Sequence, residues 1–342
     1  MQKPIDLRSD TITKPTPDMR KAMYEAEVGD DVFKEDPTVN ALEEYAAELL
    51  GKEAALFVSS GVMGNQLCLN VQTRPGDEVI CERDSHIFNY ESGSPAALSG
   101  ISLNPVDGIR GVFTSEQAET AIRPADAYYM AHTKGIAIEN THNRAGGAIH
   151  PIGNIIALAK LAEKHSLFYH LDGARIWNAS VVTGISVKEY ATYFNSVSCC
   201  LSKGLGAPVG SIIAGSRDFI NEAFRVRKAW GGGMRQLGIL AAAGLFALKN
   251  NISRLTDDHQ KARYLYEVLK NISSIEVDDT ETNIIIFKSN KISIEDAIKR
   301  CEEKGLLLSV GRVGYLRAIT HLDVSFDEIE KAGLILEEIF NK

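Results

Sequence analysis

The sequence has few cysteines, and none is spaced as a metal ligand or a redox pair. The 342 residues include five cysteines, an odd number scattered along the chain. This pattern argues against a disulfide framework and against a zinc module. We therefore expect reduced thiols, no bound metal and a cytoplasmic protein. The cysteines are Cys68, Cys81, Cys199, Cys200 and Cys301.

The sequence also lacks a basic excess and a long hydrophobic run. Lysine and arginine total 37 against 45 acidic residues, a net charge of −8, which argues against nucleic acid or an acidic membrane surface as partner. The most apolar stretch, 237–248, has 12 residues and is too short to cross a bilayer. Residues 1–6 lack the charged start and apolar run of a secretory signal.

Short apolar runs alternate with amphipathic stretches, which is typical of an α/β fold. The length suggests about two domains at roughly 150 residues each. Asp36 and Pro37 predict the start of a helix that Gly51 ends, and a second helix is expected over 155–165. Such alternation predicts a mostly parallel sheet covered by helices. The expected strands are 54–58, 78–81, 136–138, 168–171, 197–201 and 211–214.

From about residue 250 the pattern changes to that of a smaller α+β domain of about 90 residues. Helices are expected over 252–271, 294–303 and 326–340, and strands over 283–287, 306–310 and 315–319.

Residues 57–66 combine the end of a buried strand, two serines, Gly61 and the start of a helix. Backbone N–H groups and the dipole at a helix N-terminus favour an anion at such a turn. No Gly-Lys-Ser/Thr sequence follows, which excludes a nucleoside-triphosphate loop. The segment predicts a phosphate cradle, with a tight turn that binds nothing as the alternative.

Residues 170–175 place Asp172 at the end of a predicted strand. In an open parallel sheet, ligands bind beyond the carboxyl ends of the strands. An aspartate beside an apolar wall is costly to bury without a cationic partner. Asp172 is therefore a candidate ligand-binding residue, and a surface ion pair with Arg175 is the alternative.

Residues 200–210 hold Lys203 between a buried strand and a glycine-rich turn. A lysine in this setting can act as an amine nucleophile, and the alternative is a lysine that caps a carbonyl. The three segments together fit pyridoxal 5'-phosphate (PLP). The phosphate would lie in the cradle and the pyridine nitrogen on Asp172, and the aldehyde would join Lys203, 31 residues later, as a Schiff base.

Eight motifs follow one another along essentially the whole chain: DLRSDT (6–11), VGDDV (28–32), EDPTVN (35–40), ENTHN (139–143), HLDGAR (170–175), LSKGL (201–205), GGGMRQ (231–236) and THLDV (320–324). In composition and order they resemble the threonine aldolase family, which belongs to the aspartate-aminotransferase-like (fold type I) PLP enzymes. The resemblance implies a retro-aldol lyase that splits L-threonine or L-allo-threonine into glycine and acetaldehyde.

The resemblance also implies the domain organisation and the assembly. Residues 1–15 would contribute to the active site, 16–249 would form a large PLP-binding domain, and 250–342 a small C-terminal domain. The usual assembly of the family implies a homotetramer built from dimers that share active sites.

The roles implied by the resemblance fall first on the cofactor. Lys203 would carry it, and Asp172 would keep its pyridine nitrogen protonated so that the ring accepts electrons. His86 would stack over the ring and help to remove the β-hydroxyl proton. Gly61 and Val62 would supply backbone donors to the phosphate.

Other implied roles concern the substrate and a neighbouring subunit. Ser9, Arg175 and Arg317 would hold the substrate carboxylate, because a guanidinium group fits a carboxylate at two points. Arg175 would also contact the cofactor. Lys228 and Arg235 would reach the phosphate site of a neighbouring subunit.

The sequence departs from the family pattern at six positions. Val62 replaces the usual threonine of the cradle. Tyr129 stands where relatives that act on threonine often have histidine, so it is a candidate substrate-binding residue near the β-hydroxyl. The remaining departures are Phe33 and Lys34, expected near the pocket mouth, and His132 and Trp230.

Two alternatives stay open. A PLP-dependent β-eliminating lyase or aminotransferase would act on another amino acid, although aminotransfer needs a second carboxylate-binding element that the sequence does not identify. A PLP-binding protein without activity would be expected to lack Lys203, Asp172 or Arg317, and all three are present.

Overall fold

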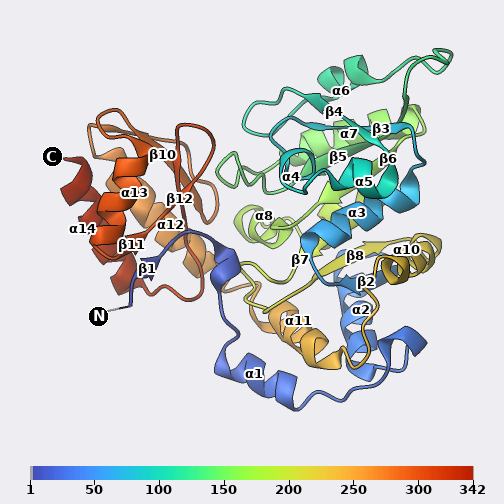
Figure 1. The fold of residues 1–342 in the computed structure, drawn as a ribbon, viewed down its shortest axis with the longest axis horizontal. Coiled ribbons are helices and arrows are strands. Elements are labelled where there is room, and N and C mark those ends of the chain that lie inside the picture. Colours follow the sequence, from blue (N-terminus) through green and yellow to red (C-terminus); the bar gives the residue numbers. More distant parts are fainter. Residues whose placement is uncertain (1–2, 342) are drawn as a thin grey trace.

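A seven-stranded sheet forms the centre of the larger domain in the computed structural model, which describes residues 3–341 (Figure 1). Every strand is parallel to its neighbours except β8, which is antiparallel to both of its own. The predicted mostly parallel sheet is confirmed. In spatial order the strands are β2 (Ala54–Val58), β8 (Ser211–Gly215), β7 (Ser196–Cys200), β6 (Phe168–Asp172), β5 (His132–Glu139), β3 (Asp77–Glu82) and β4 (Ser102–Val106).

Helices cover both faces of the sheet (Figure 1). One face carries α3 (Gly61–Gln72), α5 (Ser94–Ser99) and α10 (Arg217–Ala229). The larger apolar core lies on the other face, where its helices are α2 (Pro37–Leu50), α6 (Ser115–Ala121), α7 (Ile152–Lys164), α8 (Ile176–Thr183), α9 (Val187–Thr192) and α11 (Gly238–Asn250). The short elements are α1 (Pro17–Tyr24), which packs on α11, α4 (His86–Asn89), and the 3₁₀ turns η1 (Asp10–Ile12) and η2 (Asp31–Phe33).

Helix α2 shows how local sequence determines the ends of an element. The Asp36 carboxylate accepts the N–H groups of Thr38 and Val39 at 3.1 and 3.0 Å, and Pro37 occupies the first helical position. Gly51 ends the helix with φ at +62°, a conformation that glycine adopts without strain. The predicted start and end of this helix are confirmed.

The smaller domain has a four-stranded antiparallel sheet in the order β12 (Ser309–Val310), β13 (Leu316–Ile319), β10 (Ile284–Ser289) and β9 (Ile275–Val277). Its helices are α12 (Leu255–Lys270), α13 (Ile294–Glu303) and α14 (Phe326–Phe340). The N-terminal strand β1 (Ile5–Asp6) pairs in parallel with β11 (Leu306–Leu307), and Leu7 joins the small-domain core. Figure 1 accordingly shows both termini on the small-domain side.

Three strands, β1, β4 and β9, were not among the predicted elements. Strand β4 was not expected, because its sequence SLNPV is polar and contains Pro105; the strand is tolerated because it lies at the sheet edge. The strand predicted over 306–310 is two short strands, β11 and β12, which pair with different partners. Within residues 3–341, no helix has both the length and the apolar character needed to span a membrane.

Candidate active site

A cavity of about 310 Å³ opens beyond the carboxyl ends of β2, β5, β6 and β7. Parallel strands bring their carboxyl ends to one edge of the sheet, so residues distant in sequence meet there. Five of the predicted site residues line this cavity: Gly61, Val62, His86, Asp172 and Lys203.

The N-terminus of α3 forms one wall of the cavity. The Ser60 hydroxyl accepts the N–H of Met63 at 3.1 Å, while Gly61 and Val62 occupy the first turn, where backbone N–H groups have no intrahelical acceptor. A Cβ atom on Gly61 would lie 2.8 Å from the sulfur of Cys200, so only glycine lets the helix approach β7 this closely. The geometry suits an anion, as the predicted cradle requires.

Asp172 lies at the end of β6 and is 4% exposed. One carboxylate oxygen accepts the Asn65 amide at 2.8 Å and the other accepts the N–H of Ala174 at 3.1 Å. The alternative ion pair with Arg175 is wrong, because Arg175 pairs with Asp10 at 2.6 and 2.8 Å. Asp172 thus lies beside the cavity without a cationic partner among residues 3–341.

The Asp10–Arg175 pair is buried between η1 and the turn after β6. Burial by itself raises the pKa of the Asp10 carboxyl, but the facing Arg175 guanidinium outweighs it and lowers that pKa to about 2. The N-terminal segment therefore holds a buried charge against Arg175, although the sequence did not single out Asp10.

Lys203 follows β7 and is half-buried at the cavity wall. Its ammonium group makes no hydrogen bond or ion pair with any residue in 3–341, so the structure gives no support to a carbonyl-capping lysine. Its own carbonyl accepts the N–H of Gly206 at 2.8 Å and the Thr13 hydroxyl at 3.3 Å, which fixes the backbone and leaves the amine free.

His86 starts α4 on another wall of the cavity. Its backbone N–H donates to Glu139 at 2.7 Å, and its Nδ1 lies 2.9 Å from the Glu91 carboxylate. Burial by itself lowers the pKa of His86. The hydrogen bond to Glu91 and the charges of Asp172 and Glu139 together raise this pKa by more, so the net shift is upward. The second ring nitrogen, Nε2, has no partner among the described residues.

Arg317 on β13 and Arg175 converge on one amide. The side-chain oxygen of Asn143 accepts Nη1 of Arg317 at 3.1 Å and Nη1 of Arg175 at 3.4 Å. Arg317 has no carboxylate partner in residues 3–341; burial, followed by the charges of Arg175 and Arg144, lowers its pKa to about 10. An unpaired, half-buried guanidinium is suited to a carboxylate ligand.

Ser9, whose hydroxyl accepts the N–H of Thr11 at 3.2 Å, lies at the start of η1.

Six predicted site residues do not line this cavity. Arg175, Arg317 and Ser9 lie next to it through contacts with its lining residues Asn143 and Thr11, and the other three lie elsewhere in the chain. Tyr129 is 73% exposed and precedes β5, at the opposite end of that strand from Glu139. Lys228 is exposed near the end of α10, and Arg235 pairs with Asp30 at 2.8 Å. Their roles at the site stay predictions.

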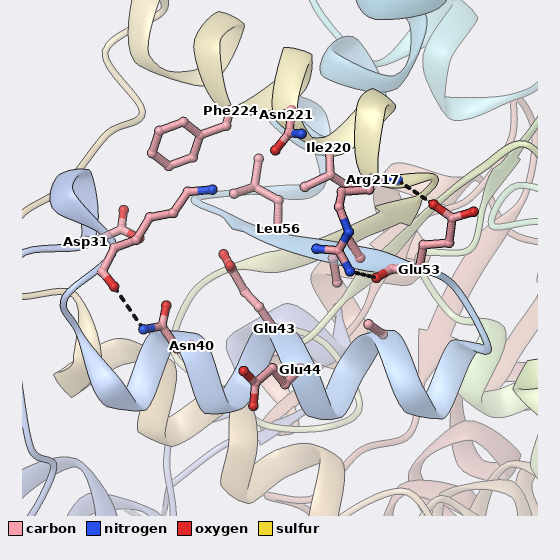
Figure 2. A pocket seen from close by; sticks show the side chains of 14 residues that line it. Asp31, Asn40, Glu43, Glu44, Glu53, Leu56, Arg217, Ile220, Asn221 and Phe224 are labelled. Carbon is pink, nitrogen blue, oxygen red and sulfur yellow. Dashed lines mark hydrogen bonds between the residues drawn. The ribbon is translucent and has the colours of Figure 1, made fainter.

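Lys34, expected near the pocket mouth, lines a second cavity of about 330 Å³ between α2, β2 and α10 (Figure 2). Its ammonium group lies over the ring of Phe224, 4.9 Å from the ring centre. Glu43 points into the same space, and its carboxylate accepts the N–H of Phe57 at 2.8 Å. Neither Lys34 nor Glu43 lines the Lys203 cavity.

Sequence comparisons identify the family of the chain. The chain matches the model of the beta-eliminating lyase family over residues 6–291. The chain belongs to that family. It is 45% identical to a probable low-specificity L-threonine aldolase 2 from Arabidopsis thaliana, over 98% of this chain and 97% of that one. It is 41% identical to the low specificity L-threonine aldolase of Escherichia coli K12, over 96% and 97%.

The fold is shared as well. A threonine aldolase from Leishmania major superposes with a TM-score of 0.86, over 98% of this chain and 100% of that one, at 18% identity. The resemblance to threonine aldolases and the fold type I architecture are thus confirmed, and family membership makes the protein a lyase.

Proposed function

We propose that this protein is a PLP-dependent aldolase that cleaves L-threonine or L-allo-threonine into glycine and acetaldehyde. The observation that carries the proposal is a single cavity in which a helix N-terminus, the Asp172 carboxylate, the unpaired Lys203 amine and His86 meet. The relatives that are more than 40% identical over nearly their whole length are named for this activity.

The residues present fit PLP. The N–H groups at Gly61 and Val62 suit its phosphate, Asp172 suits a protonated pyridine nitrogen, and Lys203 offers a free amine to its aldehyde. When bound, the cofactor supplies an electron-withdrawing ring that stabilises negative charge at the substrate Cα. Asp172 supports that function because both of its oxygens are held as hydrogen-bond acceptors by Asn65 and Ala174.

The substrate contacts follow from the two guanidinium groups. Arg317 binds the substrate carboxylate, and Arg175, held by Asp10, fixes Asn143 and with it the position of Arg317. Ser9 adds a hydroxyl at the same edge. Fixing the carboxylate decides which bond at Cα stands where it can break. His86 then accepts the β-hydroxyl proton as the Cα–Cβ bond opens.

The active enzyme is a cytoplasmic homotetramer whose dimers share active sites. Support comes from Lys228, Arg235 and Tyr129, which have no contact with the cavity of their own chain and are exposed. Each is free to approach a neighbouring copy, where Lys228 and Arg235 would add positive charge to the phosphate site.

The test is product analysis of the purified, PLP-loaded protein with L-threonine, L-allo-threonine and phenylserine in separate reactions. We expect glycine with an equal amount of acetaldehyde, or of benzaldehyde from phenylserine. Ammonia with a keto acid would instead identify β-elimination or aminotransfer, and would refute the proposal.

A further inference from the structure

A buried carboxylate, Glu91, lies behind His86 and belongs to none of the motifs recognised in the sequence. It is 2% exposed and follows α4 by two residues. One of its oxygens lies 2.9 Å from Nδ1 of His86 and 2.9 Å from the Asn65 amide nitrogen. The other accepts the side-chain amide of Gln66 at 2.5 Å.

These contacts determine the hydrogen-bonding state of the histidine. Asn65 and Gln66 direct amide N–H groups at the two Glu91 oxygens, so both oxygens act as acceptors. A carboxylate can only accept from His86, so the imidazole proton is held on Nδ1. The unprotonated Nε2 is the nitrogen left for the cavity.

We propose that Glu91 is a positioning residue of the aldol cleavage, which holds His86 in the tautomer and orientation that let Nε2 accept the β-hydroxyl proton. This inference rests on the proposed function. In the proton transfer the O–H bond breaks and an N–H bond forms at Nε2. The O–H electron pair becomes the second bond of the aldehyde carbonyl, and the Cα–Cβ pair stays on the carbon that becomes glycine.

Glu91 also stabilises the imidazolium that the transfer creates. The other charged groups that face His86 are Asp172 from β6, Glu139 from β5, and Lys203 across the cavity. Asp172 is engaged by Ala174 and by the second amide hydrogen of Asn65, and Glu139 binds the backbone of His86 and of Asn143. Among these carboxylates only Glu91 contacts the ring itself, so its removal should affect the ring most.

The variant E91Q removes the charge and keeps the shape. The side-chain oxygen of Gln66 is buried without a hydrogen-bond partner, so Gln66 can rotate its amide by 180° and accept from the amide introduced at position 91. The matched control is E43Q, which removes the charge of another acid of the larger domain, one that accepts a single hydrogen bond and lines the second cavity (Figure 2).

We expect E91Q to lower kcat/KM for aldehyde release by about 10- to 100-fold, and E43Q to change it less than about twofold. In the E91Q protein the pKa of His86, followed by NMR of the cofactor-free chain, should fall. The ascending limb of the pH–rate profile should move to lower pH with it. A double-mutant cycle with H86N distinguishes a positioning role of Glu91 from a role in folding. If Glu91 acts through His86, E91Q should lower kcat/KM little further once His86 is absent.

Three results would overturn the inference in an enzyme that releases aldehyde normally: unchanged E91Q kinetics, full additivity with H86N, or an unmoved His86 titration. Nitrogen NMR of the wild-type chain gives a test that needs no stable E91Q variant. There the neutral His86 ring, identified by its loss in H86N, must carry its proton on Nδ1. If the wild type releases no aldehyde from any substrate, the proposed function fails instead.

Discussion

The two cavities of the larger domain have nearly the same volume, about 310 and 330 Å³, and each holds a half-buried or buried acid and a lysine. They differ in what those groups do for the fold. In the Lys203 cavity the polar groups are held by Asn65 and by backbone N–H groups, and the Lys203 amine stays free. In the proposed function these groups serve the chemistry.

In the second cavity the polar groups complete the edge of the sheet. Strand β2 is an edge strand, and Phe57 would expose both of its backbone groups. Glu43 accepts its N–H at 2.8 Å, and the buried Arg227 donates to its carbonyl at 2.6 Å while pairing with Asp31 at 2.7 Å. Cavity volume therefore does not distinguish the two cavities. They differ in their lysines: the Lys203 amine is left without a hydrogen-bond partner among the described residues, whereas the Lys34 ammonium lies over the Phe224 ring.

The largest expected effect is at the two lysines. K203A should lower aldehyde release by roughly 10⁴-fold or more and abolish the Schiff-base absorption band, because the amine that holds the cofactor is gone. K34A, its counterpart in the second cavity, should stay within about threefold of wild type. Steady-state kinetics and absorption spectra check both. Equal losses in the two variants would contradict the functional distinction between the cavities.

At the next level, D172N should bind PLP yet lower kcat by roughly 10²- to 10³-fold, since a neutral amide no longer stabilises a protonated pyridine nitrogen. E43A should instead lower the free energy of unfolding by about 1–3 kcal/mol, because it leaves the Phe57 N–H without its partner. Kinetics and chemical denaturation separate the two outcomes. Unchanged turnover in D172N would refute its assigned role.

The two buried ion pairs provide a third comparison. D10N leaves the buried Arg175 without its acid and should cost about 3–5 kcal/mol of unfolding free energy. D31N should cost less, because burial raises the pKa of Asp31 and so already disfavours its charged form beside Arg227. Only D10N should also raise KM, since Arg175 holds Asn143 beside Arg317.

Ionisation of the two aspartates should change the free energy of unfolding in opposite directions. Asp10 has a folded pKa of about 2 against an ordinary 3.8, so its stabilisation is present above 3.8 and lost as the pH falls towards 2. Burial, only partly offset by Arg227, raises the pKa of Asp31, so its ionisation on raising the pH costs stability. Denaturation of both variants from pH 2 to 5 measures this; parallel profiles would contradict it.

The smallest effect is expected for E43Q. Burial raises the pKa of the Glu43 carboxyl to about 7 from an ordinary 4.5, so the folded protein binds a proton that the unfolded chain releases. The stabilisation that the wild type gains from the protonated Glu43 carboxyl is fully present below pH 4.5 and declines as the pH rises to 7. The Tm of E43Q relative to wild type should therefore increase across that interval, as thermal unfolding at several pH values will show. A constant difference would contradict the assigned burial.

The residues that sequence analysis identified share a local signature. Gly61, Asp172 and Lys203 each lie at or just beyond the end of an apolar strand, and the topology of parallel strands predicts that such residues meet. The residues that it missed have ordinary local surroundings. Asn65 lies inside a helix, Glu91 in a loop, and Asp10 in a short turn, and none follows a strand of the large sheet directly.

What marks those three residues as part of the site is their contacts with residues that are distant in the sequence. Asn65 meets Asp172 across 107 residues of sequence, and Asp10 meets Arg175 across 165. No periodicity or spacing specifies such a pairing, because it depends on how the strands are ordered and where η1 rests against the sheet. Tyr129, Lys228 and Arg235 lie outside the cavity of their own chain, so the fold of a single chain does not test their predicted roles.

By itself the sequence determined the class of fold and the ends of helices such as α2. It also predicted the three features that suggested PLP, namely an anion cradle, an acid and an amine. These follow from short-range rules of capping, periodicity and strand ends. Only the tertiary structure decided which acid faces Arg175, that Lys34 lines a separate cavity, and that Glu91 contacts the ring of His86. Hydrogen bonds and ion pairs act over a few ångströms, and only folding brings distant segments that close.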